Sequence, residues 1–217
     1  MQMDVIWRNL PYLFQGLALT LKISGMVIIG GLLLGILFGI LRSSSIRLIR
    51  IIAAIYIEYI RGTPLLIVLF LVYFGIPPVI GLHFTAYQAA TIGFIVFIAA
   101  YIAEDVRSGL NSVPKGQIEA GLASGLSSQQ VLMLIVLPQA IRRMLPALFN
   151  QFVRLTKFTS VASVIGVIEL TGAAQIINAR AFIPLETYLT IACTYLMICC
   201  PLSLFGRYLN TRFAVKT

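Results

Sequence analysis

Charged residues are scarce in this chain. Asp, Glu, Lys and Arg make up 11% of its 217 residues, whereas 59% are apolar, and a soluble domain carries roughly a quarter charged residues. Apolar runs of about twenty residues recur, which is the length that a helix needs to cross a hydrocarbon core. An ordinary soluble domain is therefore excluded. We expect an all-α integral membrane protein, because a backbone inside lipid must satisfy its own hydrogen bonds.

Residues that hold metals or catalyse reactions are also few. Cys193, Cys199 and Cys200 fall within one apolar run and lack the spacing of a zinc site, and His83 is the single histidine. The sequence contains no G-x4-G-K-[ST] motif, which P-loop proteins use to hold the phosphates of ATP. We therefore predict no metal, no cofactor in this chain and no catalytic residue, so that the chain is not an enzyme.

Five apolar segments predict five transmembrane helices in a single domain of residues 1–217. The longest polar stretch, at about 107–144, separates the third segment from the fourth. The expected spans lie at about 17–41, 51–74, 86–106, 145–168 and 188–204.

Basic residues predict how the chain is oriented. They concentrate after the first, third and fifth spans, whereas Arg8 and Arg180 are the clear examples on the opposite side. Because positive flanks stay in the cytoplasm, we expect the N-terminus outside and the C-terminus inside. The net charge of +9 is spread along membrane edges, so no nucleic-acid partner is expected. The cytoplasmic set is Arg42, Arg47, Arg50, Arg107, Lys115, Arg142, Arg143, Arg207, Arg212 and Lys216.

The polar stretch contains a short amphipathic segment. Ser127 and Ser128 can cap a following helix, and Gly125 offers a small residue where two backbones cross. Such a segment lies at the membrane interface or fits into a groove of a partner protein; periodicity alone leaves both interpretations open. Its apolar residues are Leu122, Leu126, Val131 and Leu134.

The same stretch resembles a known family. Its spacing E-A-G-x3-G-x9-I-x-L-P is similar to the cytoplasmic loop of permease subunits of ABC importers, which docks into a separate ATPase subunit. Gly121 stands where that family usually has alanine. The residues that carry this resemblance are Glu119, Ala120, Gly121, Gly125, Ile135, Leu137 and Pro138.

Further motifs resemble the polar amino-acid branch of these importers, the glutamine, arginine and histidine type. Residues 58–65 read E-Y-I-R-G-T-P-L, residues 100–104 read A-Y-I-A-E, and residues 137–140 read L-P-Q-A. The resemblance implies a type I importer permease with a cytoplasmic coupling helix in a bacterial inner membrane. It also implies the partners: an ATP-binding cassette subunit that holds ATP and Mg, a second permease subunit (itself or a homologue), an external amino-acid-binding protein, and membrane lipid.

Ionisable and polar residues inside the spans are candidate functional residues. Glu58 and Arg61 lie three residues apart and are expected to form a structural pair; a ligand site is the alternative. In the family that the chain resembles, position 151 is often acidic in relatives that carry basic amino acids, so the resemblance implies a neutral or acidic substrate for a chain with glutamine there. Alternatively, Arg154 and Lys157 face water or lipid phosphates. The substrate-path candidates are Gln151, Arg154, Thr156, Lys157 and Thr159.

The leading hypothesis is a permease subunit that forms the translocation path of an ATP-driven importer of polar amino acids. A self-contained ion-coupled carrier or channel for small solutes is the alternative. That alternative would need no nucleotide and would show ion-dependent flux.

Overall fold

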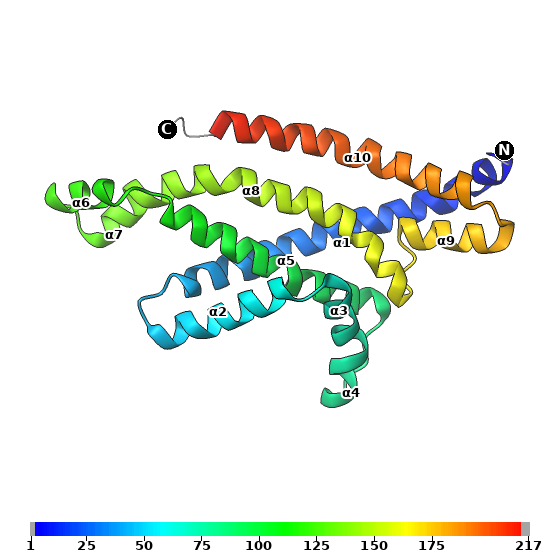
Figure 1. Cartoon of the computed structure of the whole chain (residues 1–217), viewed down its shortest axis with the longest axis horizontal. Coiled ribbons are helices and arrows are strands. Elements are labelled where there is room, and N and C mark those ends of the chain that lie inside the picture. The colour runs from blue at the N-terminus through cyan, green and yellow to red at the C-terminus, as the bar shows by residue number, and fades with distance from the viewer. Residues whose placement is uncertain (1–2, 214–217) are drawn as a thin grey trace.

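The computed structural model describes residues 3–213, and most of them are helical. The long helices run roughly along one axis of an elongated molecule (Figure 1). No strand occurs within residues 3–213, and the prediction of an all-α protein is confirmed. The elements are α1 (Met3–Arg42), α2 (Arg47–Gly62), α3 (Leu65–Phe70), η1 (Leu71–Gly75), α4 (Ile76–Ile80), α5 (Ala86–Asn111), α6 (Lys115–Ala123), α7 (Ser128–Val131), η2 (Leu132–Val136), α8 (Leu137–Phe158), η3 (Thr159–Ile165), α9 (Leu170–Ala181) and α10 (Pro184–Phe213).

Among the described residues, four helical segments are long and apolar enough to cross a membrane. They are α1, α5, the continuous stretch Ser128–Ile165 and α10. A fifth crossing results if α2 and the stretch Leu65–Ile80, which meet at a bend of 111°, form one broken span. The expected span at about 51–74 falls across this bend, and the other four expected spans overlap the four long segments.

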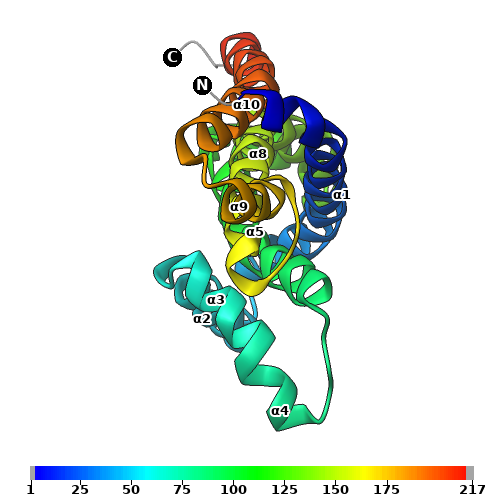
Figure 2. The same ribbon diagram turned by 90° about the vertical axis from the view of Figure 1, so that its right-hand side faces the viewer.

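A proline breaks the second span. Pro64 has no N–H to donate, and its ring keeps the residue before it out of the helical region. Thr63 accordingly ends α2 in extended backbone, with φ −101° and ψ 134°. The chain then turns into α3; α2 and α3 pack against α5, whereas α4 projects away from the helices of the bundle (Figure 2).

Helices α1 and α5 pack against each other through glycines. A Cβ atom at Gly35 would come within 2.5 Å of Ile102 Cγ2, and one at Gly39 within 2.8 Å of Val106 Cβ. The two backbones therefore approach more closely than larger residues would allow, as small residues in this register permit within membranes. A Cβ at Gly25 on the same helix would have no neighbouring atom within 4 Å. Gly25 therefore does not take part in the close contact between α1 and α5.

One carboxylate joins three helices at the end of the molecule that carries α9. Glu169 is 0% exposed and caps the start of α9. Its Oε1 accepts a hydrogen bond from the Gly172 N–H at 2.9 Å, and its Oε2 accepts one from the Thr171 N–H at 3.0 Å. The hydroxyls of Tyr195 on α10 and Thr20 on α1 also donate to Oε2, at 3.0 and 3.3 Å. The fold itself therefore satisfies this buried charge.

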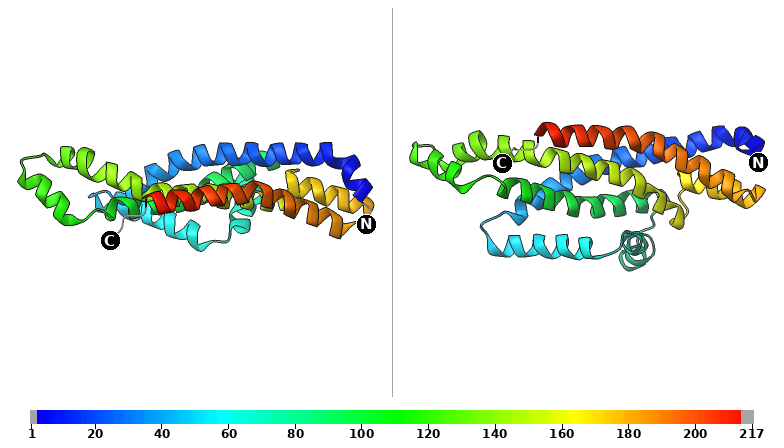
Figure 3. Two further views of the ribbon diagram at one scale, coloured as in Figure 1. Left: turned by 90° about the horizontal axis from the view of Figure 1, so that it is seen from above. Right: turned by 45° about the horizontal axis from the view of Figure 1, so that its top comes forward.

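The expected polar stretch at about 107–144 is mostly helical. Helix α5 continues to Asn111, and α8 begins at Leu137. The segment between them forms α6, α7 and η2 at one end of the molecule, and the start of α1 and α9 lie at the other end (Figures 1 and 3). Helices α8 and α10 lie side by side along the top of Figure 1.

Candidate functional site

The segment of residues 115–136, which we call the α6–α7 loop, has a defined turn. Gly125 adopts the left-handed conformation, with φ +85°. The Leu126 N–H donates to the Gly121 carbonyl at 3.2 Å, and the Gly125 N–H donates to the Leu122 carbonyl at 3.0 Å. These two bonds form the Schellman motif, which ends helices and favours glycine at the left-handed position. Gly125 therefore sets the direction in which the chain leaves α6.

Helix α7 starts with a capping box. The Ser127 hydroxyl accepts a hydrogen bond from the Gln130 N–H at 3.3 Å, and the Gln130 Oε1 accepts one from the Ser127 N–H at 2.9 Å. This reciprocal arrangement satisfies two backbone donors that the helix leaves free. The expectation that serine caps this helix is confirmed for Ser127.

The α6–α7 loop has a small apolar core of its own. Val113, Val131 and Val136 are buried, and Leu126 packs partly against them. Gly121 is also buried, and a Cβ there would lie 2.7 Å from Ile135 Cδ1. Gly121 and Ile135 thus hold the loop together from within. An alanine at position 121 would require the flexible end of Ile135 to shift.

Other residues of the motif face outward. Glu119, Ala120, Gly125 and Pro138 are exposed, and Leu137 is half-buried. A Cβ at Gly125 would have no neighbouring atom within 4 Å, so the turn is open on that side.

The apolar residues of this loop separate into two groups. Leu122 is 46% exposed and Leu134 is also exposed, whereas Leu126 and Val131 belong to the loop core. The structure therefore offers an exposed surface around Leu122 and Gly125 on a scaffold that is already folded.

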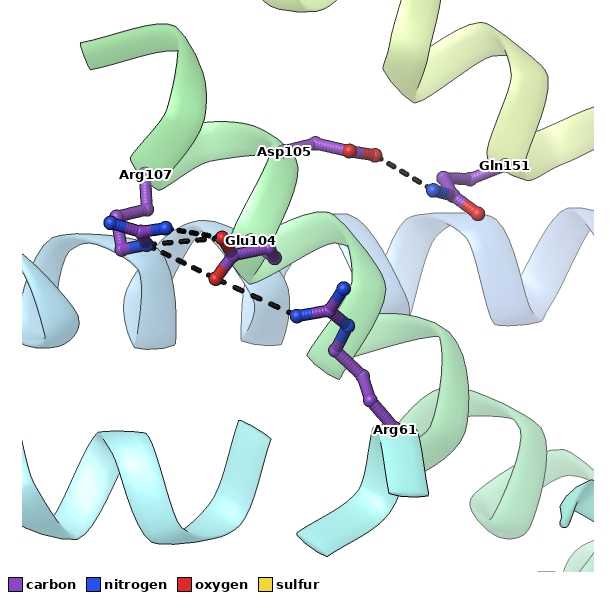
Figure 4. Close-up of polar contacts among 5 residues, drawn as sticks. All are labelled: Arg61, Glu104, Asp105, Arg107 and Gln151. Atoms are coloured by element: carbon purple, nitrogen blue, oxygen red, sulfur yellow. Dashed lines mark hydrogen bonds and ion pairs between the residues drawn. The ribbon is translucent and has the colours of Figure 1, made fainter. Parts of the chain in front are cut away.

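A second polar site lies between α2, α5 and α8 (Figure 4). We call it the polar cluster; its members are Arg61, Tyr101, Glu104, Asp105, Arg107, Gln151 and Arg154. Glu104 accepts hydrogen bonds from the Arg107 guanidinium and lies 3.8 Å from Arg61 Nη1. The guanidinium carbons of Arg61 and Arg154 lie 5.7 and 5.9 Å from the centre of the Tyr101 ring. Both distances are within the range of cation–π attraction.

Gln151 occupies the side of the cluster on α8. Its Nε2 donates to Asp105 Oδ2 at 2.8 Å. Its Oε1 is buried and has no hydrogen-bond partner among the described residues. The side chain is 7% exposed, and buried acceptors without a partner are rare in proteins. Gln151 therefore turns its amide nitrogen toward the Asp105 carboxylate, while its oxygen points away from that carboxylate and stays unpaired (Figure 4).

The pairing expected for Arg61 is corrected by the structure. Glu58 is exposed on α2, and the ion pairs within residues 3–213 join Arg61 and Arg107 to Glu104. Arg61 reaches across to α5, where the side chain of Glu104 is 21% exposed and also pairs with Arg107. The charge is thus neutralised between helices and not within α2.

The other polar residues expected in the fourth span do not gather at Gln151. The Thr156 hydroxyl donates to the Phe152 carbonyl at 3.1 Å, and the Thr159 hydroxyl donates to the Thr156 carbonyl at 2.8 Å. Lys157 instead lines a cavity of about 410 Å³ with Tyr195 and other residues of α10. Of the expected set, the structure brings only Gln151 and Arg154 into the polar cluster.

Sequence reasoning did not place Tyr101, Glu104 or Asp105 at a site, and it used Arg107 only as a basic flank that predicts orientation. Tyr101 and Glu104 belong to the A-Y-I-A-E motif, and Asp105 directly follows it. Adjacent acidic residues in an apolar helix are a usable signal, because ionisable groups are costly in lipid. Which of them faces Gln151 depends on how α5 and α8 pack.

The fold and the loop together define a class: the membrane permease of a type I ABC importer. Residues 31–215 match the family described as "Binding-protein-dependent transport system inner membrane component". The chain belongs to this family, whose members are transport subunits and not catalytic ones. Permeases of this class are multi-pass membrane proteins that work with an ATPase, a second permease subunit and a binding protein.

Curated relatives cover nearly the whole chain. It is 41% identical over 207 residues to the probable amino-acid ABC transporter permease protein YckA of Bacillus subtilis (strain 168), covering 95% of this chain and 91% of that protein. It is 39% identical over 218 residues to the glutamine transport system permease protein GlnP of Escherichia coli (strain K12), covering 99% and 100%.

Solved structures share the fold. A chain from the crystal structure of an amino acid ABC transporter with histidines superposes with a TM-score of 0.90 at 34% identity, covering 95% of this chain and 96% of that one. A chain of the inward-facing MetNI methionine ABC transporter gives a TM-score of 0.71 at 22% identity, covering 99% and 100%. The second likeness concerns the fold alone.

Proposed function

We propose that this chain is the permease subunit of an ATP-driven importer of polar amino acids and that residues 119–138 couple it to a separate ATPase. The observation that carries the coupling is the exposed turn at Gly125, held on the loop's own core and flanked by the exposed Leu122. Relatives named as amino-acid and glutamine permeases support the substrate class.

The loop is suited to transmit movement. Its core ties α6 and α7 to Leu110 near the end of α5 and to Val113 just beyond that end, and η2 continues directly into α8. Because the loop is already folded, a force on the exposed turn would be transmitted directly to the long helices α5 and α8. ATP-driven closure of the partner would bias the helices between two arrangements, outward-facing and inward-facing.

The polar cluster supplies groups that complement an α-amino acid. The Asp105 carboxylate and the unpaired Gln151 Oε1 are acceptors that suit an ammonium group, and the Arg154 guanidinium suits a carboxylate. Charge-assisted hydrogen bonds of this kind are the strong ones. A neutral glutamine at position 151 favours a neutral or acidic substrate. Lys157 lines a separate cavity against α10, and the Thr156 and Thr159 hydroxyls bond to nearby backbone carbonyls, so these three residues are not part of this proposed contact.

Orientation and partners follow from the same proposal. The N-terminus lies outside the bacterial inner membrane, and the α6–α7 loop and the C-terminus lie in the cytoplasm. Of the basic residues that predict this orientation, Lys216 lies outside the described residues. ATP and Mg belong to the partner ATPase, an external amino-acid-binding protein delivers the substrate, and the second permease subunit is this chain or a homologue.

Pull-down of the ATPase tests the coupling proposal. The permease is tagged and co-expressed with a candidate ATP-binding subunit, and the amount of ATPase recovered is compared among three variants. Leu122→Glu places a charge on the exposed surface, and Gly125→Val cannot adopt the left-handed turn. Gly125→Asn also adds a side chain at this place, but asparagine tolerates the left-handed conformation. This variant therefore tests whether a side chain beside the turn blocks the partner when the backbone conformation of the turn is kept.

We expect Leu122→Glu and Gly125→Val to lower ATPase recovery at least tenfold while the permease still inserts into membranes. Loss in Gly125→Asn as well would mean that the partner fills the open space at the turn. Full recovery of the ATPase with both Leu122→Glu and Gly125→Val would overturn the coupling proposal. In a separate flux measurement, ion-dependent transport by the chain alone, without nucleotide, would support the carrier alternative.

A further inference from the structure

A basic pocket lies where the start of α8 meets the end of α10. It has a volume of about 480 Å³ and is lined by Gln117, Gln139, Arg142, Arg143, Arg212 and Phe213. Three of these six residues are arginines, and none is acidic. A pocket of this volume is within the range of small-ligand sites.

The three arginines are not neutralised by the part of the chain that the structure describes. The ion pairs of residues 3–213 involve Glu104 and lie elsewhere. Arg143 donates to the Ser112 carbonyl, which fixes its side chain without cancelling its charge. Gln139 donates to Gln117 Oε1 and to the Ile135 carbonyl, so the neutral wall of the pocket is held in place as well.

The two helices that meet at the pocket also carry exposed apolar residues, which do not line the pocket itself. Ile141 and Leu145 on α8 and Leu204 and Tyr208 on α10 are exposed on the helices that meet there. Both helices belong to segments that are long and apolar enough to cross a membrane. An occupant with an anionic head and apolar tails would therefore place the head among the arginines and the tails along these helices.

We propose that this pocket binds the phosphate of an anionic phospholipid. Arginine offers a planar fork of donors that matches two phosphate oxygens, and basic pockets between transmembrane helices on the cytoplasmic side hold anionic headgroups. A bound lipid bridges α8 and α10 and steadies the helix that follows the α6–α7 loop. The pocket does not include Leu122 or Gly125, although Gln117 of α6 lines it.

Native mass spectrometry of the full-length chain, without ATPase, tests this site. The chain is titrated with phosphatidylglycerol, with phosphatidylcholine and with inorganic phosphate. The test variant is Arg142→Gln with Arg212→Gln. The matched control is Arg47→Gln with Arg50→Gln, which removes the same charge from exposed arginines of α2 that do not line the pocket.

We expect phosphatidylglycerol to bind at least tenfold more tightly than phosphatidylcholine, and the test variant to lose that preference while the control keeps it. Equal losses in both variants would show that net charge alone attracts the lipid, which would overturn the pocket. Inorganic phosphate binding as tightly as phosphatidylglycerol would overturn the lipid as the ligand. Melting temperatures of both variants, measured in detergent, identify any loss that reflects unfolding.

Discussion

Glu169 and Gln151 are both buried polar side chains in the helical bundle, yet their surroundings differ. The Glu169 carboxylate accepts four hydrogen bonds, from two backbone N–H groups and from hydroxyls on α1 and α10. Gln151 donates one hydrogen bond, to Asp105, and its Oε1 has no partner in the described chain. The fold completes the first site and leaves the second with a free acceptor.

This difference separates a structural role from a binding role. A buried polar group without a partner costs free energy unless something else satisfies it. Glu169 connects α1, α9 and α10, and its removal would leave several donors unpaired. Gln151 lies in a cluster whose charges are only partly neutralised, with an Arg61–Glu104 distance of 3.8 Å. We therefore expect mutations at the two sites to affect different properties of the protein.

Replacing Glu169 with alanine should have the largest effect on stability. The change removes a helix cap and leaves buried N–H and hydroxyl groups unpaired, which we expect to cost about 2–4 kcal/mol. Thermal unfolding of the detergent-purified chain measures this, with the exposed Glu119→Ala as the matched control. A melting temperature equal to that of the control would show that Glu169 does not hold the three helices together.

Replacing Gln151 with leucine should affect transport more than stability. Loss of one hydrogen bond to a charged substrate group is worth about 1.4 kcal/mol, or roughly tenfold in uptake. Uptake is measured in proteoliposomes with the ATPase and the binding protein, and Asn150→Leu, exposed on the same helix, is the control. If uptake is unchanged, or if the melting temperature falls as far as in Glu169→Ala, Gln151 has a structural role.

Replacing Arg61 with alanine should have the smallest effect. The Arg61 side chain is 35% exposed and its pairing with Glu104 is long, so the pair is expected to contribute about 0.5 kcal/mol, as solvent-screened pairs do. Glu104 also retains Arg107. A double-mutant cycle of Arg61→Ala and Glu104→Ala, followed by thermal unfolding, measures the coupling energy. A value above about 2 kcal/mol would mean that this cluster is held as firmly as Glu169.

Local features of the fold could be predicted well from the sequence. The apolar runs indicated the helices, and the serines before residue 129 indicated the cap of α7. The glycines of α1 at positions 35 and 39 lie four residues apart on one helical face, and the structure places them against Ile102 and Val106 of α5. Each of these features depends on neighbouring residues or on one helical face, so a single sequence contains the necessary pattern.

Contacts between distant residues were not predicted. Arg61 was expected to pair with Glu58, because residues three apart share a helical face, but it pairs with Glu104 on α5. The candidates of the fourth span were treated as one set, but Lys157 faces α10 while Gln151 faces Asp105. Which face of α8 meets α5 depends on packing across the bundle, and no local pattern in the chain specifies it.

The sequence by itself determined that this protein is a helical membrane permease with a folded polar loop, because hydropathy and motif spacing are properties of contiguous residues. Only the tertiary structure decided which charges meet. It separated the buried and exposed residues of the loop, left Gln151 Oε1 unpaired, and brought Arg142 and Arg212 to one pocket. These outcomes depend on how helices approach and rotate against one another, and that is set by the sum of many contacts between residues far apart in the chain.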